Sequence, residues 1–314
     1  MKSLMLVTMG VAAGVAMSTC VWGAEEAPAK KEKEGKAARH GRRAAGWKLG
    51  MQAWTFHTNT LFEAIDKTHE LGLKYMELIP GQALSPEQKD VKFDENASQE
   101  QIKKVQDKLK AADIQAICYG VAKFGTTVEE ASKVFEFAKK MGITTIGAEP
   151  DPAVMKTIDK LANEYEINVA IHNHPKPSHY WNPDTLLEAI KGCGKRIGAC
   201  ADTGHWTRSG LDPMECLKKL EGRVLACHFK DLNEKGPKAH DVVWGTGVND
   251  AKGLLAELKR QHFDGPLMIE YEYNWDKSMP EIKQCIEFFN KTVRELRGQG
   301  RELGGRKTKP AEEK

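Results

Sequence analysis

Short apolar runs alternate with amphipathic segments from Trp47 to Leu296, and this alternation constrains the fold more than any other feature of the sequence. Continuous apolar runs of this length are typical of buried strands in a parallel sheet. The segments between them have helical periodicity, and glycines such as Gly72 and Gly142 mark helix ends. Eight such units in about 250 residues predict a single α/β domain, a (β/α)8 TIM barrel over residues 47–296. The expected strands are 49–54, 75–79, 115–121, 143–149, 168–174, 197–202, 224–230 and 267–272.

Four of these apolar runs end at a side chain that can bind a cation: Glu149, Asp202, His228 and Glu270. Because the carboxyl ends of the strands in a parallel barrel converge on one mouth, we expect these four side chains to meet there. Carboxylate oxygens and imidazole nitrogens suit a divalent cation such as Mn, Mg, Co or Zn. The simpler alternative is that each carboxylate only caps the helix that follows its strand.

Strand periodicity supports a site at the mouth. Residues two apart in a strand share a face, so His172 and His174 share one face of the fifth strand, and His228 and Lys230 share one face of the seventh. The intervening residues are apolar and would meet the helices. This pattern favours a polar barrel mouth over scattered polar insertions.

The chain resembles the xylose-isomerase-like TIM-barrel superfamily, which includes sugar isomerases and epimerases of the tagatose-epimerase type. The resemblance covers residues 47–296 and depends on the motifs at 202–205, 227–231, 245–247 and 269–272. In ketose epimerases a divalent metal is held by Glu, Asp, His and Glu on strands five to eight. The resemblance implies that Asp202, His228 and Glu270 are the last three of these ligands and that His205 contacts the substrate.

The sequence departs from the family on the fifth strand, where His172 stands at the usual glutamate position. Glu149, on the neighbouring strand, is expected to supply the missing carboxylate. The alternative is that His172 itself is the fourth ligand.

The resemblance implies a metal-dependent sugar isomerase or epimerase that moves a proton next to the carbonyl of a free keto-sugar or keto-glycoside. Two alternatives remain: a 3-keto-glycoside lyase or hydratase that uses the same metal site, and a non-catalytic sugar-binding barrel. An endonuclease-IV-type enzyme is disfavoured because strands two and three carry none of the extra histidines that its metals require. The expected catalytic residues are Glu149 and Glu270, and the expected substrate contacts are His172, His174, His205, Lys230 and Trp54.

Charge distribution argues against a nucleic-acid partner. The chain has 314 residues and a formal net charge of +3, but residues 25–45 hold seven Lys/Arg against four Asp/Glu, and residues 301–314 hold five against three. The remainder is close to neutral, so no basic face is expected on the folded part. A small-molecule sugar is the expected partner, and a homo-oligomer is compatible with the sequence.

Both ends of the chain differ in composition from the middle. Residues 1–23 have a charged start, a short apolar run and small residues, which together predict an export signal and a periplasmic location. Cys20 offers a lipoprotein anchor as a less favoured alternative. The apolar run is too short for a membrane span. Residues 24–46 are expected to form a disordered charged linker, and residues 297–314 a flexible tail.

Overall fold

The computed structural model describes residues 47–305, with side chains to residue 298. The expected export signal (1–23), the charged linker (24–46) and the end of the expected tail lie outside the described residues.

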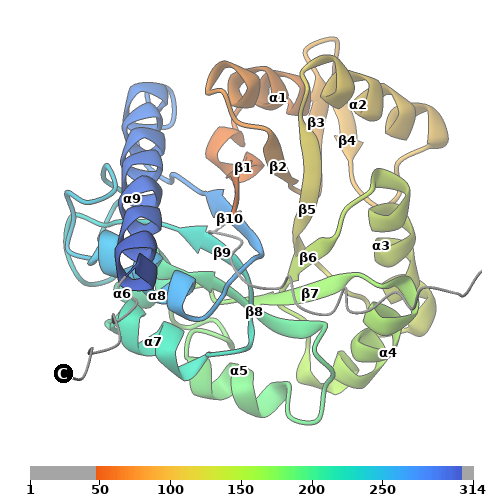
Figure 1. The fold of residues 1–314 in the computed structure, drawn as a ribbon. Helices are drawn as coiled ribbons and strands as arrows, with labels where there is room; N and C mark the ends of the chain where they lie inside the picture. Colours follow the sequence, from red (N-terminus) through yellow and green to blue (C-terminus); the bar gives the residue numbers. More distant parts are fainter. Residues whose placement is uncertain (1–46, 306–314) are drawn as a thin grey trace, which may run out of the picture. The chain divides into compact units, whose positions relative to one another are not determined.

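Eight parallel strands close into a barrel, as the alternation predicted (Figure 1). Around the barrel the strands follow the order β1-β10-β9-β8-β7-β6-β5-β2, and β1 pairs with β2 to close the ring. Each of the eight neighbouring pairs is parallel, so all carboxyl ends lie at the same mouth. The barrel strands are β1 Lys48–Gln52, β2 Tyr75–Leu78, β5 Gln115–Ala122, β6 Thr145–Ala148, β7 Asn168–His172, β8 Ile197–Asp202, β9 Val224–Phe229 and β10 Pro266–Ile269.

Helices surround the barrel, and local sequence signals fix several of their ends (Figure 1). Thr60 and Glu63 form a capping box at the start of α1. Helix α3 ends at Gly142, whose φ of 73° is one that glycine adopts without strain. The helices are α1 Leu61–Glu70, α2 Gln99–Ala111, α3 Val128–Met141, α4 Met155–Tyr165, α5 Pro183–Ala189, α6 Thr203–Arg208, α7 Pro213–Lys219, α8 Ala251–Arg260 and α9 Met279–Gly305, with short 3-10 turns at η1 Ala53–Phe56 and η2 Pro152–Val154.

The two faces of the strands differ as periodicity predicted. Val169 and Ile171 of β7 belong to the large hydrophobic cluster that includes helical residues such as Leu161 of α4. In contrast, Ala170 of β7 packs in a separate small cluster with residues of β8 and β9. His172 lies on the same face of β7 as Ala170. On β7, β8 and β9 the interior face is therefore lined by small residues that lead up to polar ones at the mouth.

Three features of the fold were not expected from the sequence. An antiparallel hairpin, β3 Gln82–Ser85 and β4 Gln88–Phe93, lies outside the barrel sheet. Helix α6 begins directly after β8, with no intervening loop. Helix α9 continues to Gly305, past the expected end of the closing helix at Leu296. Within residues 47–305, no helix combines the length and the apolar character needed to cross a bilayer.

Candidate active site

The residues expected to form a site lie where neighbouring strands end. His172 and Asp202 are the last residues of β7 and β8, and His228 is the penultimate residue of β9. Glu149 and Glu270 directly follow β6 and β10. His172, Asp202 and His228 are almost completely buried. The barrel brings these strand ends to one mouth, and the distances between polar atoms show which of the five side chains meet there.

A set of nitrogen and carboxylate donors converges at the centre of the mouth, which we call the central group. Nε2 of His172 lies 3.6 Å from Oδ2 of Asp202, and Nε2 of His205 lies 3.6 Å from the same oxygen. One ligand atom from each of His172, Asp202, His205 and Glu270 lies within 4.8 Å of every other. The central group consists of His172, Asp202, His205, His228 and Glu270.

His228 joins this group through one ring nitrogen. Its Nδ1 is 3.1 Å from Nε2 of His172 and 3.2 Å from Oε2 of Glu270. Donors bound to one cation at about 2.0–2.2 Å stand roughly 3–3.5 Å apart. The separations in the central group therefore fit the coordination shell of a divalent cation, and the mix of imidazole and carboxylate donors suits a transition metal.

The positive charge of Lys230 lies next to the carboxylates of the central group. Its buried Nζ lies 2.7 Å from Oδ2 of Asp202, 2.5 Å from Oε2 of Glu270 and 3.0 Å from Oε2 of Glu272. Its stem runs under α6, where a Cβ on Gly204 would approach the Lys230 side chain to 2.8 Å. Glycine at this position of the Asp-Thr-Gly-His motif therefore makes room for the lysine.

The charges of the central group are strongly coupled. Burial opposes ionisation of Asp202, but His205 and Lys230 outweigh it and hold the pKa of this carboxyl well below its usual range. Burial likewise opposes the charge on Glu270, and Lys230 and His228 hold its pKa well below the usual range. Burial lowers the pKa of His205 well below its usual value. Against the effect of burial, Asp202 and Glu149 raise the pKa of His172, and Cys200, Glu77 and Glu270 hold the pKa of His228 well above its usual value. The centre thus contains ionised carboxylates, the form that binds metals, beside imidazoles that must release a proton when a cation binds.

Glu149 lies in a second cluster nearer the solvent, which we call the rim group: Glu149, His172 and His174. Oε1 of Glu149 accepts hydrogen bonds from the backbone N of His174 at 2.9 Å and contacts Nδ1 of its ring at 2.7 Å. Nδ1 of His172 is 3.7 Å from the same oxygen. Among the described contacts, none joins Glu149 directly to Asp202, His228 or Glu270. His172 lies between the two clusters, with Nε2 toward the centre and Nδ1 toward the rim.

Glu149 is held in the ionised form. Burial favours its protonation, but hydrogen bonds from His172 and His174 outweigh burial and lower the pKa of Glu149 far below its usual value. Ser178 donates a hydrogen bond of 2.8 Å to Oε2, the other carboxylate oxygen. The side chain is 22% exposed, so this carboxylate can be reached from solvent.

Two aspartates of the sequence motifs, Asp202 and Asp231, also have structural roles. Oδ1 of Asp202 accepts a hydrogen bond of 2.7 Å from the backbone N of His205, so Asp202 caps α6 as the simpler alternative proposed. Its other oxygen, Oδ2, faces the central group. Asp231 accepts bonds from the backbone N of Gly245 and Gly247, which ties the Gly-Thr-Gly loop to the end of β9.

The structure adds residues that the sequence did not single out. Arg208 contacts Nδ1 of His205 at 3.1 Å, pairs with Asp241 at 2.8 Å and also pairs with Glu272. Asn173 exchanges two hydrogen bonds with the backbone of Asp202. The only signal for Arg208 in the sequence is its position three residues after His205, which places both on one face of a helix.

Trp54 and a pocket lie at the rim of the mouth. Trp54 belongs to η1, directly after β1, and is 42% exposed while its ring stacks on His57 at a centroid distance of 4.5 Å.

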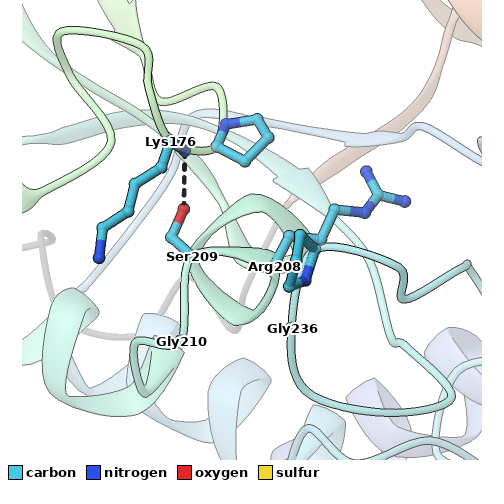
Figure 2. A pocket seen from close by; sticks show the side chains of 7 residues that line it. Lys176, Arg208, Ser209, Gly210 and Gly236 are labelled. Atoms are coloured by element: carbon cyan, nitrogen blue, oxygen red, sulfur yellow. Dashed lines mark hydrogen bonds between the residues drawn. The ribbon is translucent and has the colours of Figure 1, made fainter.

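A cavity of about 360 Å³ lies between the loop that follows β7 and the end of α6, where the backbone N of Lys176 donates to Oγ of Ser209 (Figure 2). Its lining residues are Pro175, Lys176, Arg208, Ser209, Gly210, Gly236 and Pro237.

Comparison with known proteins identifies relatives of this barrel. A family model described as xylose isomerase-like TIM barrel matches residues 65–292. The solved structure of an uncharacterised protein from Parabacteroides distasonis ATCC 8503 is 39% identical, covers 78% of this chain and 98% of that one, and superposes with a TM-score of 0.64. A xylose isomerase-like TIM barrel protein from Mycobacterium smegmatis, solved in complex with magnesium, is 13% identical over 81% of this chain and 98% of that one, with a TM-score of 0.62.

Among curated proteins, an inosose dehydratase from Clostridium botulinum (strain Eklund 17B / Type B) is 27% identical over 151 residues. The matched stretch is 43% of this chain and 48% of the dehydratase. The chain therefore spans about half the length of this curated relative.

Proposed function

Because this chain belongs to the xylose isomerase-like TIM barrel family, we propose that it is a divalent-metal-dependent isomerase or epimerase that transfers a proton next to the carbonyl of a keto-sugar or keto-glycoside. The observation that carries this proposal is the central group, in which ligand atoms of His172, Asp202, His205 and Glu270 lie within 4.8 Å of one another and His228 adjoins His172 and Glu270. The magnesium complex of the Mycobacterium smegmatis barrel is consistent with a metal in this fold.

His172, Asp202, His205, His228 and Glu270 are the residues proposed to hold the cation. His172 replaces Glu149 in the set expected from the sequence, because its Nε2 lies among the central donors whereas Oε1 of Glu149 contacts His174 at the rim. A divalent cation bound here supplies a Lewis acid that polarises the sugar carbonyl. Mn, Zn, Co and Mg are all candidates, and the three imidazoles favour the transition metals and Zn over Mg.

The proton is proposed to move through the two glutamates. Glu270 belongs to the central group and Glu149 to the rim group, so a substrate at the mouth would have a carboxylate at each of two separate positions. Both are ionised at neutral pH, the form that accepts a proton from carbon. Lys230 is proposed to act by positioning carboxylates, since its buried ammonium group already contacts Asp202, Glu270 and Glu272 with its three N–H donors. His174 and Trp54 at the rim are proposed to contact the sugar.

A lyase or hydratase is the second candidate, and the curated relative favours it. An inosose dehydratase removes water, and the similarity reaches 27% over 151 residues. Elimination needs the same first step, loss of a proton next to a carbonyl, and then a proton donor for the departing hydroxyl. The glutamate that takes the proton from carbon can return it to this hydroxyl, which leaves as water.

Turnover in deuterated water, followed by NMR, distinguishes the candidates. A panel of keto-sugars and 3-keto-glycosides is incubated with the manganese-loaded protein, and Glu270→Gln is the matched inactive control. Deuterium in an intact sugar supports isomerisation or epimerisation, whereas an unsaturated product supports elimination. A protein that binds the metal but turns over no member of the panel would contradict both and indicate a sugar-binding barrel.

A further inference from the structure

We propose that the rim group, Glu149, His172 and His174, is a second cation site that takes a transition-metal dication. Oε1 of Glu149, Nδ1 of His172 and Nδ1 of His174 form a triangle with sides of 2.7, 3.4 and 3.7 Å. Two imidazoles and one carboxylate on a single face are a recurring ligand set for Zn and non-haem Fe, with the remaining positions left open.

The rim group is built by adjacent strands and is held in place. Glu149 follows β6, while His172 ends β7 and His174 lies two residues further. The backbone N of His174 and Oγ of Ser178 both bond to Glu149, which fixes the direction of the carboxylate. The rings of His172 and His174 are 4.4 Å apart between centroids and nearly perpendicular, at 69°. Three donors that are fixed before binding lose little entropy when a cation arrives.

Solvent access distinguishes this cluster from the central group. The side chains of His174 and Glu149 are 45% and 22% exposed, whereas those of Asp202 and His228 have no exposed area. A cation at the rim group could therefore keep water or substrate oxygens in its open positions. Two nitrogen donors out of three favour Zn, Co, Mn or Fe over Mg.

The two clusters share His172 but present different nitrogens of its ring. Nδ1 faces the rim group, and Nε2 faces Asp202 and His228. A neutral imidazole has one lone pair, so His172 binds one cation at a time. When both sites are filled, His172 binds the rim cation, and Asp202, His205, His228 and Glu270 hold the central one. Glu149 would bind the rim cation through Oε1 and keep Oε2 for proton transfer. A cation at the rim group does not require the sugar chemistry proposed above.

Cobalt(II) titration of the metal-stripped full chain tests this second site, by isothermal calorimetry and by the visible absorption of the bound ion. Five proteins are compared: the natural chain, Asp202→Asn, His174→Ala, His179→Ala and the double variant with Asp202→Asn and His174→Ala. His179 is an exposed imidazole on the same loop and is the matched control. We expect two cobalt ions per natural chain and per His179→Ala chain, and one per His174→Ala chain. Asp202→Asn should keep one ion, and adding His174→Ala to it should weaken that binding by more than about 100-fold.

The rim site is overturned if His174→Ala and His179→Ala bind the same number of cobalt ions, or if Asp202→Asn binds none. Circular dichroism establishes that each variant is folded, and His174→Gln and Glu270→Gln replace any variant that is not. His174→Ala retains only the central site, so it measures the central ion separately. If His174→Ala binds no cobalt while Asp202→Asn binds one ion, the result counts against the proposed function and not against the rim site.

Discussion

Glu77 and His228 are 151 residues apart in the chain and meet in a buried hydrogen bond of 2.8 Å between Oε2 and Nε2. Because an ionised carboxylate can only accept, Nε2 of His228 carries the proton in this hydrogen bond, so in the neutral ring that binds a metal the lone pair lies on Nδ1, toward the central group. Two glycines allow this approach, since a Cβ on Gly120 or Gly147 would lie 2.9 or 3.2 Å from Oε1 of Glu77. Glu77 therefore sets the tautomer and the orientation of His228.

The substitution Glu77→Gln should weaken cation binding about 10–100-fold, as loss of such a carboxylate partner does at other histidine-metal sites. The affinity is measured by competition with a chromogenic chelator. The control is Glu100→Gln, which removes an exposed ion pair with Lys104 on α2 and should leave cation affinity unchanged. Equal affinities for the two variants would show that Glu77 has no part in holding the metal.

Lys230→Met should destabilise the metal-free protein by about 3–5 kcal/mol, because Asp202 and Glu270 lose their buried counter-charge. A saturating divalent cation should restore part of this loss, since ligand at 100 times its Kd contributes about 2.7 kcal/mol. Urea unfolding with and without manganese measures both effects. If manganese stabilises Lys230→Met no more than it stabilises the natural chain, the metal ion does not replace the charge of the Lys230 ammonium.

The barrel could be predicted from the sequence because its signals are local. The apolar runs, the glycine at Gly142 and the capping residues around Thr60 each act within a few residues. Strand periodicity correctly placed Val169 and Ile171 toward the helices. The hairpin β3–β4 gave no such signal, because Gln88–Phe93 contains little apolar periodicity and pairs outside the core sheet.

The arrangement within the candidate site could be predicted less completely. The sequence showed that carboxylates and histidines would end neighbouring strands, but the choice between Glu149 and His172 depends on where each strand stops and where each side chain points. Strand β6 ends at Ala148, one residue before Glu149, whereas His172 remains within β7. The Glu77–His228 contact depends on closure of the barrel, which no local pattern encodes.

Trp54→Ala tests whether the rim aromatic contacts the sugar. An exposed ring that stacks on His57 contributes little to folding, so the free energy of unfolding should change by no more than about 0.5 kcal/mol. Loss of an aromatic face should raise KM about 2- to 10-fold with little change in kcat, because such contacts contribute about 0.5–1.5 kcal/mol. Steady-state kinetics on the substrate identified by NMR measures this. Val128→Ala, an exposed residue on α3, is the control, and an unchanged KM for Trp54→Ala would place the sugar elsewhere.

Glu257 on α8 provides a pH-dependent contribution to stability that is separate from the site. Arg260 and Gln261 donate hydrogen bonds of 2.7–2.8 Å to its carboxylate, and the contact with Arg260 lowers the pKa of Glu257 from 4.5 to about 2. A carboxyl whose pKa is lower in the folded state stabilises the fold fully above the unfolded pKa and loses this effect as the pH falls through the folded one. Glu257→Gln should therefore cost about 0.5–1 kcal/mol at pH 7. Urea unfolding of both proteins from pH 7 down toward pH 2 should show the difference shrinking below about pH 4.5, and a difference that stays constant would rule out the ion pair as its source.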